Sequence, residues 1–208
     1  MAQPITCTVS SRTGNTRKVA DAVMAELQRL GWNVRERERG QAVDTQLVAM
    51  FFWCFKSTFD PLNAKLLESM KGKRILVFGT FGGYPDSPYG NKVRANITRA
   101  VNQHNECVGV FLSQGKVRLD NVEKRRNLPP EDPHHLDDAG LARVLESQRH
   151  PNDDDIRAAV AFLHERLPQL EGGQHGNCAE CGICAQSFAQ EVAARLADSK
   201  TIALGAFH

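Results

Sequence analysis

The sequence predicts an α/β protein built on a doubly wound parallel sheet, and two observations favour this fold class. Four strongly apolar segments alternate along the chain with segments whose apolar residues recur at helical spacing. The four segments are apolar throughout, as are strands that helices cover on both faces. Strands that alternate with helices form parallel sheets, and such sheets bind ligands beyond the carboxyl ends of their strands.

Composition and charge restrict the class of protein further. Of the 208 residues, 41% are hydrophobic and 24% are charged, which is ordinary for a soluble globular chain. The formal net charge of +2 creates no overall field that would attract nucleic acid or an anionic membrane. Residues 1–20 lack the layout of a signal peptide, and no apolar segment approaches membrane-spanning length. We therefore expect a cytoplasmic protein whose partners include neither nucleic acid nor a membrane.

The first predicted unit is a buried strand followed by a helix. Residues 5–10 are apolar and rich in β-forming residues, and a helical pattern begins at Thr16 and stops at Gly31. Residues 33–40 are nearly all charged after Val34, which predicts a strand at the edge of the sheet. The apolar face of the helix comprises Val19, Ala20, Val23, Leu27 and Leu30.

Two further core strands flank a second helix. Residues 46–54 form a second strongly apolar segment, and residues 74–80 form a third. Between them, residues 60–61 (Asp-Pro) open a helix that ends near residues 71–72. The apolar face of this helix is expected to comprise Leu62, Leu66 and Met70.

The remaining elements continue the alternation and then become irregular. The next three are a loop at residues 82–90, a helix at residues 93–101 and the last core strand at residues 107–115. The charged, proline-rich residues 116–135 predict irregular backbone, and helices follow at residues 137–147 and 153–167. Residues 1–170 are thus expected to form one domain, and residues 171–208 a short cysteine-rich helical tail.

A hydroxyl-rich turn, SSRTGNT at residues 10–16, joins the first strand to the first helix. It fits neither the ATP-binding pattern G-x-x-x-x-G-K-[ST] nor the dinucleotide pattern G-x-G-x-x-G. Free backbone N–H groups at the start of a helix attract an anion, and the hydroxyls of the turn add donors. Because a P-loop lysine and an obvious magnesium ligand are missing from the sequence, a terminal monoester phosphate fits better than a triphosphate. The alternative is a polar turn that only caps the helix.

Two more loops at the same edge of the sheet carry aromatic residues and glycines. Trp53 and Phe55 follow the second apolar strand, and residues 81–89 follow the third. Aromatic side chains from two loops can sandwich a flat ring, while glycines let backbone amides reach its polar edge. Trp53, Tyr84 and Tyr89 are therefore expected to contact a ligand, and the alternative is that Trp53 and Phe55 belong to the core.

These segments resemble one family. The turn SSRTGNT resembles the phosphate loop of flavodoxins, a hydroxyl-rich turn that ends in T-G-x-T. Residues 51–90, 108–117 and 150–165 are similar to a branch of bacterial flavodoxin-like proteins that carries an F-G-T-x-G-x-Y-P-D-S loop and an F-x-x-Q-G-K strand end. Some members of this branch are associated with bile-pigment reduction. The resemblance covers most of residues 5–167, and it implies a flavodoxin-like five-stranded sheet, in the order 2-1-3-4-5, that binds FMN non-covalently.

The resemblance and the loop positions together give the candidate cofactor-binding residues. The branch carries Gly-Phe-Trp at a strand end where this chain has Phe51, Phe52 and Trp53, which alters the backbone expected beside the ring. The side chains of Phe51 and Phe52 are expected in the core. The candidate set is Ser10, Ser11, Arg12, Thr13, Gly14, Asn15, Thr16, Phe52, Trp53, Cys54, Phe55, Thr80, Phe81, Gly82, Gly83, Tyr84, Asp86 and Tyr89.

Electron transfer is the function that these features favour. An electron carrier needs only a bound flavin with an exposed ring edge, and the sequence offers no convincing constellation of catalytic acid, base or nucleophile. We therefore expect FMN to carry electrons to a redox partner protein. The alternative is an FMN-dependent NAD(P)H reductase of a small quinone or pigment. A flavin-free scaffold would make the phosphate turn a coincidence.

The long segment 113–150 bears on the choice between carrier and reductase. As a lid over the flavin it would offer His134, His135 and His150 as candidate proton donors, although a solvated loop histidine is the commoner case. The basic residues 124–126 would dock an acidic redox partner or simply form a solvated face.

The tail carries a cysteine motif of its own. Cys178, Cys181 and Cys184 stand at the C-x-x-C-x-x-C spacing of bacterial-ferredoxin cluster loops, but the fourth cysteine of that motif is missing. His175 or Cys107 would complete the ligand set of an iron–sulfur cluster or of a structural zinc. The alternative is a tail with free thiols. With a zinc site, a helix at residues 188–197 would pack on the domain or on a second subunit of a homodimer.

Overall fold

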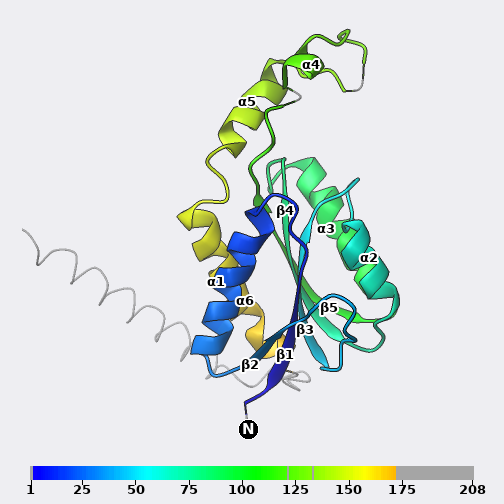
Figure 1. Ribbon diagram of the computed structural model, residues 1–208, viewed down its shortest axis with the longest axis vertical. Coiled ribbons are helices and arrows are strands. Elements are labelled where there is room, and N and C mark those ends of the chain that lie inside the picture. Colours follow the sequence, from blue (N-terminus) through cyan, green and yellow to red (C-terminus); the bar gives the residue numbers. More distant parts are fainter. Residues whose placement is uncertain (1, 121, 133, 172–208) are drawn as a thin grey trace, which may run out of the picture. The chain divides into compact units, whose positions relative to one another are not determined.

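The computed structural model describes residues 2–171 except 121 and 133. Within these residues five strands form one parallel sheet in the order β2-β1-β3-β4-β5 (Figure 1). This order confirms the predicted 2-1-3-4-5 arrangement of a doubly wound fold. The strands are β1 (Pro4–Val9), β2 (Asn33–Glu36), β3 (Leu47–Trp53), β4 (Arg74–Phe81) and β5 (Glu106–Gln114).

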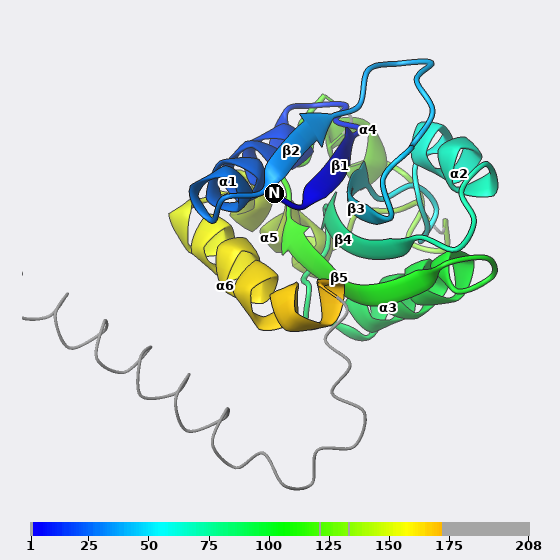
Figure 2. The same cartoon turned by 90° about the horizontal axis from the view of Figure 1, so that it is seen from below.

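Helices cover both faces of the sheet and also stand beyond one edge of it. The helices of the first face are α1 (Asn15–Arg29) and α6 (Asp153–Leu170), and those of the second are α2 (Pro61–Glu68) and α3 (Pro88–Val101) (Figure 2). Two shorter helices, α4 (Val122–Arg126) and α5 (Asp138–Ser147), lie beyond the carboxyl ends of the strands (Figure 1). We call the segment that contains them, residues 116–150, the arm.

Two adjacent phenylalanines on β3 divide between the two cores, because side chains alternate along a strand. The ring of Phe51 stacks on that of Phe78 at a centroid distance of 5.0 Å in the core under α1 and α6. The ring of Phe52 contacts that of Phe59 at 4.9 Å in the core under α2 and α3. A Cβ atom on Gly79 would lie 2.3 Å from the Phe52 ring, so the glycine makes room for it. Each of these burials stabilises the fold by about 1.5–3 kcal/mol, and both side chains are core residues as expected.

Side chains that accept hydrogen bonds from free backbone N–H groups fix the starts of three of the helices around the sheet. Asp60 caps α2 and Ser87 caps α3, and in both cases a proline follows. Asn152 caps α6 in a reciprocal capping box. The cap at Ser87 starts α3 at Pro88, inside the stretch that was expected to be loop.

The predicted apolar face of the second helix was correct at two of its three residues, which pack in the core under α2 and α3, and wrong at Leu62. Leu62 is 61% exposed, whereas Asn63 and Leu67 face the sheet. The polar Asn63 is tolerated there because its amide donates to the carbonyl of Phe51 at 2.8 Å and to the Asp60 carboxyl at 3.1 Å. Hydrophobic spacing alone could not detect a buried position that is filled by a hydrogen-bonded amide.

Other differences concern the ends of elements. Leu30, placed on the buried face of α1 by its spacing, is 37% exposed at the helix end. The α2 helix ends at Glu68, before residues 71–72, and β2 ends at Glu36, short of residue 40. Residues 116–135, expected to be irregular, contain the single helical segment α4 among the residues described there.

Candidate functional site

The phosphate turn, residues 10–16, joins the carboxyl end of β1 to the first residues of α1. Gly14 occupies the N-cap position with φ +89°, a left-handed conformation that glycine adopts without strain. Because glycine has no side chain to cap the helix, an anion at this point meets backbone N–H groups and the positive end of the helix dipole. The geometry is therefore that of an anion-binding helix start.

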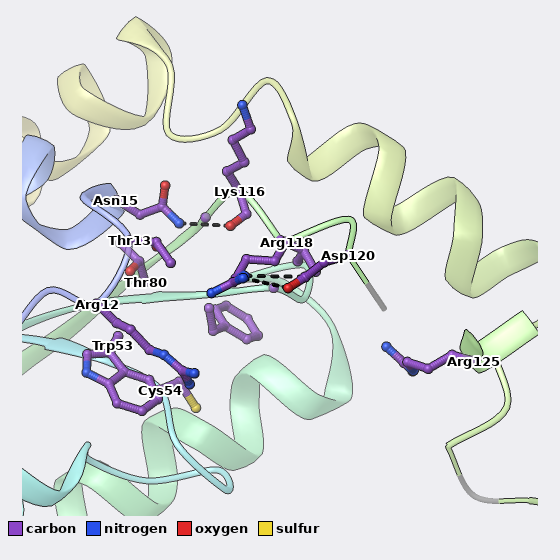
Figure 3. Close-up of a pocket in the computed structure, with 14 residues that line it drawn as sticks. Arg12, Thr13, Asn15, Trp53, Cys54, Thr80, Lys116, Arg118, Asp120 and Arg125 are labelled. Atoms are coloured by element: carbon purple, nitrogen blue, oxygen red, sulfur yellow. Dashed lines mark hydrogen bonds and ion pairs between the residues drawn. The ribbon is translucent and has the colours of Figure 1, made fainter. Parts of the chain in front are cut away.

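The hydroxyls of the phosphate turn divide between support and cavity lining. Ser10 donates to the Asp60 carboxyl at 2.8 Å, and Thr16 lies 2.8 Å from the hydroxyl of Thr80. Ser10 and Thr16 are buried, so these bonds hold the turn against α2 and β4. Thr13 instead lines a cavity beside the turn, which is described below (Figure 3). Among the hydroxyls of the turn, that of Thr13 is therefore the most directly placed for a ligand.

The loop after β3 supplies an aromatic wall. The Arg12 guanidinium lies over the Trp53 ring, 5.5 Å from its centroid, as Figure 3 shows. Cys54 follows, and its N–H donates to the carbonyl of Thr80 at 2.9 Å, so the loop continues the pairing between β3 and β4. Burial raises the pKa of the Cys54 thiol, which keeps it protonated near neutral pH.

The loop after β4 carries the second group of aromatic side chains at this edge of the sheet. Tyr84 and Tyr89 are each 45% exposed, and the Tyr89 hydroxyl lies 3.2 Å from the Ser57 hydroxyl, which links the two aromatic loops. A Cβ atom on Gly90 would lie 2.1 Å from the carbonyl oxygen of Pro85, so only glycine lets the chain turn this tightly into α3. These contacts fix the aromatic loops at the carboxyl edge of the sheet.

Two adjoining cavities lie between the phosphate turn, the aromatic loops and the arm. Figure 3 shows the residues that line the first. The first has a volume of about 500 Å³ and the second about 700 Å³, both within the range of about 300–1,000 Å³ that is typical of ligand pockets. Residues that line both are Cys54, Phe81, Gly82, Val117 and Arg125.

The structure brings most of the candidate residues to these cavities. The first is lined by Arg12, Thr13, Asn15, Trp53, Cys54, Thr80, Phe81 and Gly82, and the second adds Gly83, Tyr84 and Tyr89. Asp86 does not line either cavity. Its carboxyl group is exposed and lies 3.8 Å from the guanidinium of Arg94. The other candidates that line neither are Ser10, Ser11, Gly14, Thr16, Phe52 and Phe55.

The arm contributes lining residues that the sequence did not single out. The carbonyl of Lys116 accepts a hydrogen bond from the Asn15 amide at 3.0 Å, which ties the arm to the start of α1. The Q-G-K end of β5 was the available signal for this contact. Further lining residues from the arm are Val117, Arg118, Asp120, Arg125, Arg143 and Val144.

The histidines considered as proton donors lie elsewhere. His135 contacts the carbonyl of Leu128 at 2.8 Å, and His150 contacts the Asp155 carboxyl at 2.6 Å. His134 accepts at its backbone carbonyl from Arg125. Neither cavity is lined by any of the three, so the predicted proton donors are not supplied to this site.

The predicted metal ligands could not be placed. His175, Cys178, Cys181 and Cys184 lie outside the described residues. Among the residues that the structure does describe, His, Cys, Asp and Glu nowhere gather in a group of three or more that could hold a metal ion. Nor does this part of the chain contain a helix with the length and apolarity that crossing a membrane requires.

Comparison with known proteins identifies the family. Residues 6–164 match the family described as flavodoxin domain. The chain belongs to this flavodoxin family. It is 29% identical over 168 residues to the flavodoxin-like domain-containing protein BilS of Clostridioides difficile (strain CD3). This alignment covers 76% of this chain and 93% of that protein. It is 24% identical over 195 residues to the BilS protein of Clostridium symbiosum (strain WAL-14163). That alignment covers 79% of this chain and 96% of the relative.

A solved structure agrees with the fold. The crystal structure of oxidised flavodoxin 1 from Bacillus cereus superposes with a TM-score of 0.51 and 11% identity, covering 79% of this chain and 97% of that one. Family membership implies FMN binding, and the donor set at the cavity fits that group. The helix start at Gly14 and the hydroxyl of Thr13 suit a phosphate, and Trp53 with Tyr84 suits a flat ring.

Proposed function

We propose that this protein binds FMN non-covalently in the first cavity and carries electrons to a redox partner protein. The observation that carries the proposal is the convergence of the phosphate turn and Trp53 on the first cavity, with Tyr84 and Tyr89 lining the adjoining cavity at the same carboxyl edge of the sheet. Bound FMN would supply electron transfer, which is chemistry of the cofactor itself. We also propose that the protein works in the cytoplasm.

The chain's own residues would bind and orient the cofactor. The N–H groups at the start of α1 and the Thr13 hydroxyl would hold the phosphate, and the nearby Arg12 would add positive charge. The Trp53 ring would form one wall for the flavin ring, and Tyr84 and Tyr89 would form the other. Backbone groups of residues 80–83 would reach its polar edge.

A carrier is favoured over a reductase because the cavities lack the proton donors and the reactive thiol that were considered for a reductase. The three arm histidines do not line them, and the cavity thiol, Cys54, has a raised pKa that makes it a poor nucleophile. One observation favours the second candidate, an NAD(P)H-dependent reductase of a small quinone or pigment: the second cavity, between the aromatic loop and the arm, offers room beside the first. Rapid steady-state oxidation of NAD(P)H with a quinone or pigment, catalysed by this protein alone, would overturn the carrier function.

Substitution of Thr13 by glutamate tests the phosphate site. The new carboxylate would repel the phosphate and remove a donor, and we expect FMN affinity to fall at least about tenfold in a fluorescence titration of the apoprotein. Ser69→Glu adds the same charge at the exposed end of α2 and is the matched control. Thr16 is unsuitable for this test because a glutamate at this buried position would unfold the turn. Unchanged affinity in Thr13→Glu would contradict the assignment.

For the tail we propose a metal centre held by Cys178, Cys181 and Cys184, completed by His175 or Cys107. Only the sequence spacing supports this, and it fits an iron–sulfur cluster and a structural zinc equally. A zinc-bound tail would also be the surface for a homodimer. Metal analysis of protein prepared without oxygen separates iron with acid-labile sulfide from zinc alone. Three freely titratable thiols without metal would refute the proposal.

A further inference from the structure

Two arginines of the arm face the second cavity without a carboxylate partner. Arg125 of α4 and Arg143 of α5 both line this cavity and both are half-buried. Among the described residues, neither guanidinium lies within ion-pair distance of an Asp or Glu, whereas nearby arginines do. Arg126 pairs with Asp138 at 2.8 Å, and Arg149 pairs with Glu146 at 3.5 Å. Both guanidinium groups therefore stay available to an anion that enters the cavity.

The FMN phosphate does not account for the charge of Arg143, whereas Arg125 lines both cavities. The proposed phosphate site at Thr13 and Asn15 lines the first cavity only, whereas Arg143 lines only the second. The second cavity therefore holds positive charge that the phosphate turn does not use. That charge is available to a second anion.

The arm is fixed at the point where it meets the cavity. The hydroxyl of Ser147 accepts from the N–H of Val117 at 3.1 Å, and the side-chain amide of Gln148 donates to the carbonyl of Val117 at 2.8 Å. Arg125 is itself oriented, because its Nε donates to the carbonyl of His134 at 3.0 Å. Such contacts reduce the entropy that binding would otherwise cost.

The remaining walls of the cavity are largely apolar or aromatic. Tyr84 and Tyr89 form one side, and Pro88, Val117 and Val144 contribute aliphatic surface. Apolar walls with a few convergent polar groups are typical of small-molecule sites. A partner protein would instead meet the exposed Lys124 and Arg126 first.

We propose that the second cavity binds a flat organic anion beside the flavin, with its carboxylate held by Arg125 and Arg143. The inference rests on the proposed FMN site in the first cavity, because it places this ligand next to the flavin ring. Each guanidinium can form a charge-assisted, bidentate pair with a carboxylate. The bound anion would lie against the aliphatic surface of Pro88, Val117 and Val144.

Calorimetric titration with a matched pair of probes tests the proposal. The probes are 2-naphthoate and its neutral analogue 2-naphthamide, each added to the FMN-loaded protein. We expect the carboxylate to bind the wild type more tightly, and the double variant Arg125→Gln/Arg143→Gln to lose about tenfold in naphthoate affinity per arginine. The affinity for naphthamide should stay unchanged.

The double variant Arg126→Gln/Arg149→Gln is the control, because it removes the same charge from α4 and from the end of α5. It should keep the naphthoate affinity of the wild type. Equal losses in both double variants, or no naphthoate binding to the wild type, would overturn the proposal. Binding of an octaglutamate peptide that depends on Lys124 and Arg126, rather than on the cavity arginines, would replace it with an acidic protein partner.

A separate titration distinguishes the two proposals. The Arg143→Gln variant should bind FMN with wild-type affinity by fluorescence and lose about tenfold in naphthoate affinity, because Arg143 lines the second cavity and not the first. If FMN fails to bind the wild-type apoprotein, the proposed function fails. If FMN binds and naphthoate does not, only the second site fails.

Discussion

Replacing Asp60 by alanine should both destabilise the protein and loosen the phosphate turn. The carboxyl group is fully buried and accepts four hydrogen bonds. It caps α2 through the N–H groups of Leu62 and Asn63 at 3.1 and 3.2 Å, receives the Asn63 amide at 3.1 Å and receives the Ser10 hydroxyl at 2.8 Å. One side chain therefore links the start of α2 to the phosphate turn.

The size of the effect follows from these four bonds. Loss of a helix cap costs about 1 kcal/mol, and each buried donor left without an acceptor costs about 1–3 kcal/mol. Because relaxation and water entry recover part of this, we expect Asp60→Ala to lower the free energy of unfolding by about 3–5 kcal/mol. Urea denaturation measures the loss, and titration of the folded apoprotein should show weaker FMN binding.

A second cap provides the comparison. Asp137→Ala removes the cap of α5, where the side chain accepts one hydrogen bond, from the N–H of Gly140 at 2.7 Å. This variant should lose only about 1 kcal/mol and keep its FMN affinity. Ser10→Ala should lie between the two in stability. If Asp60→Ala loses no more stability than Asp137→Ala, the buried network does not support the turn as argued.

Two further predictions concern the flavin wall and the acid sensitivity of the fold. Trp53→Ala should weaken FMN binding about tenfold or more and shift its midpoint potentials. Leu145→Ala, at an exposed position of α5 that lines neither cavity, should change neither value; identical behaviour of the two variants would return Trp53 to a core role. The hydrogen bond from Arg29, helped by His164 and opposed by burial, lowers the pKa of Glu26 to about 2. Since the folded-state pKa is below the ordinary value of 4.5, this stabilisation is complete above that pH and is lost as the pH falls toward about 2. Melting temperatures from pH 5.5 to 2.5 should thus fall less in Glu26→Gln than in the wild type, and parallel curves would contradict the assignment.

Much of the fold and part of the site could be predicted from local sequence. The apolar segments gave the buried strands, because a strand covered on both faces cannot tolerate polar residues without a partner. The hydroxyl-rich residues 10–16 predicted an anion site, since the free N–H groups of a helix start are a property of the local backbone. The position of Trp53 and Tyr84 at the two adjoining cavities was predictable, because all strands of a parallel sheet end at the same edge.

The tertiary structure decided how these parts are held and what else joins them. Ser10 meets Asp60 across 50 positions and Thr16 meets Thr80 across 64, so their hydroxyls support the turn, which no local spacing reveals. Arg143 reaches the second cavity only because the arm is tied to the end of β5. Local sequence determines the backbone at each strand end, whereas pairing between distant side chains depends on packing that brings them together.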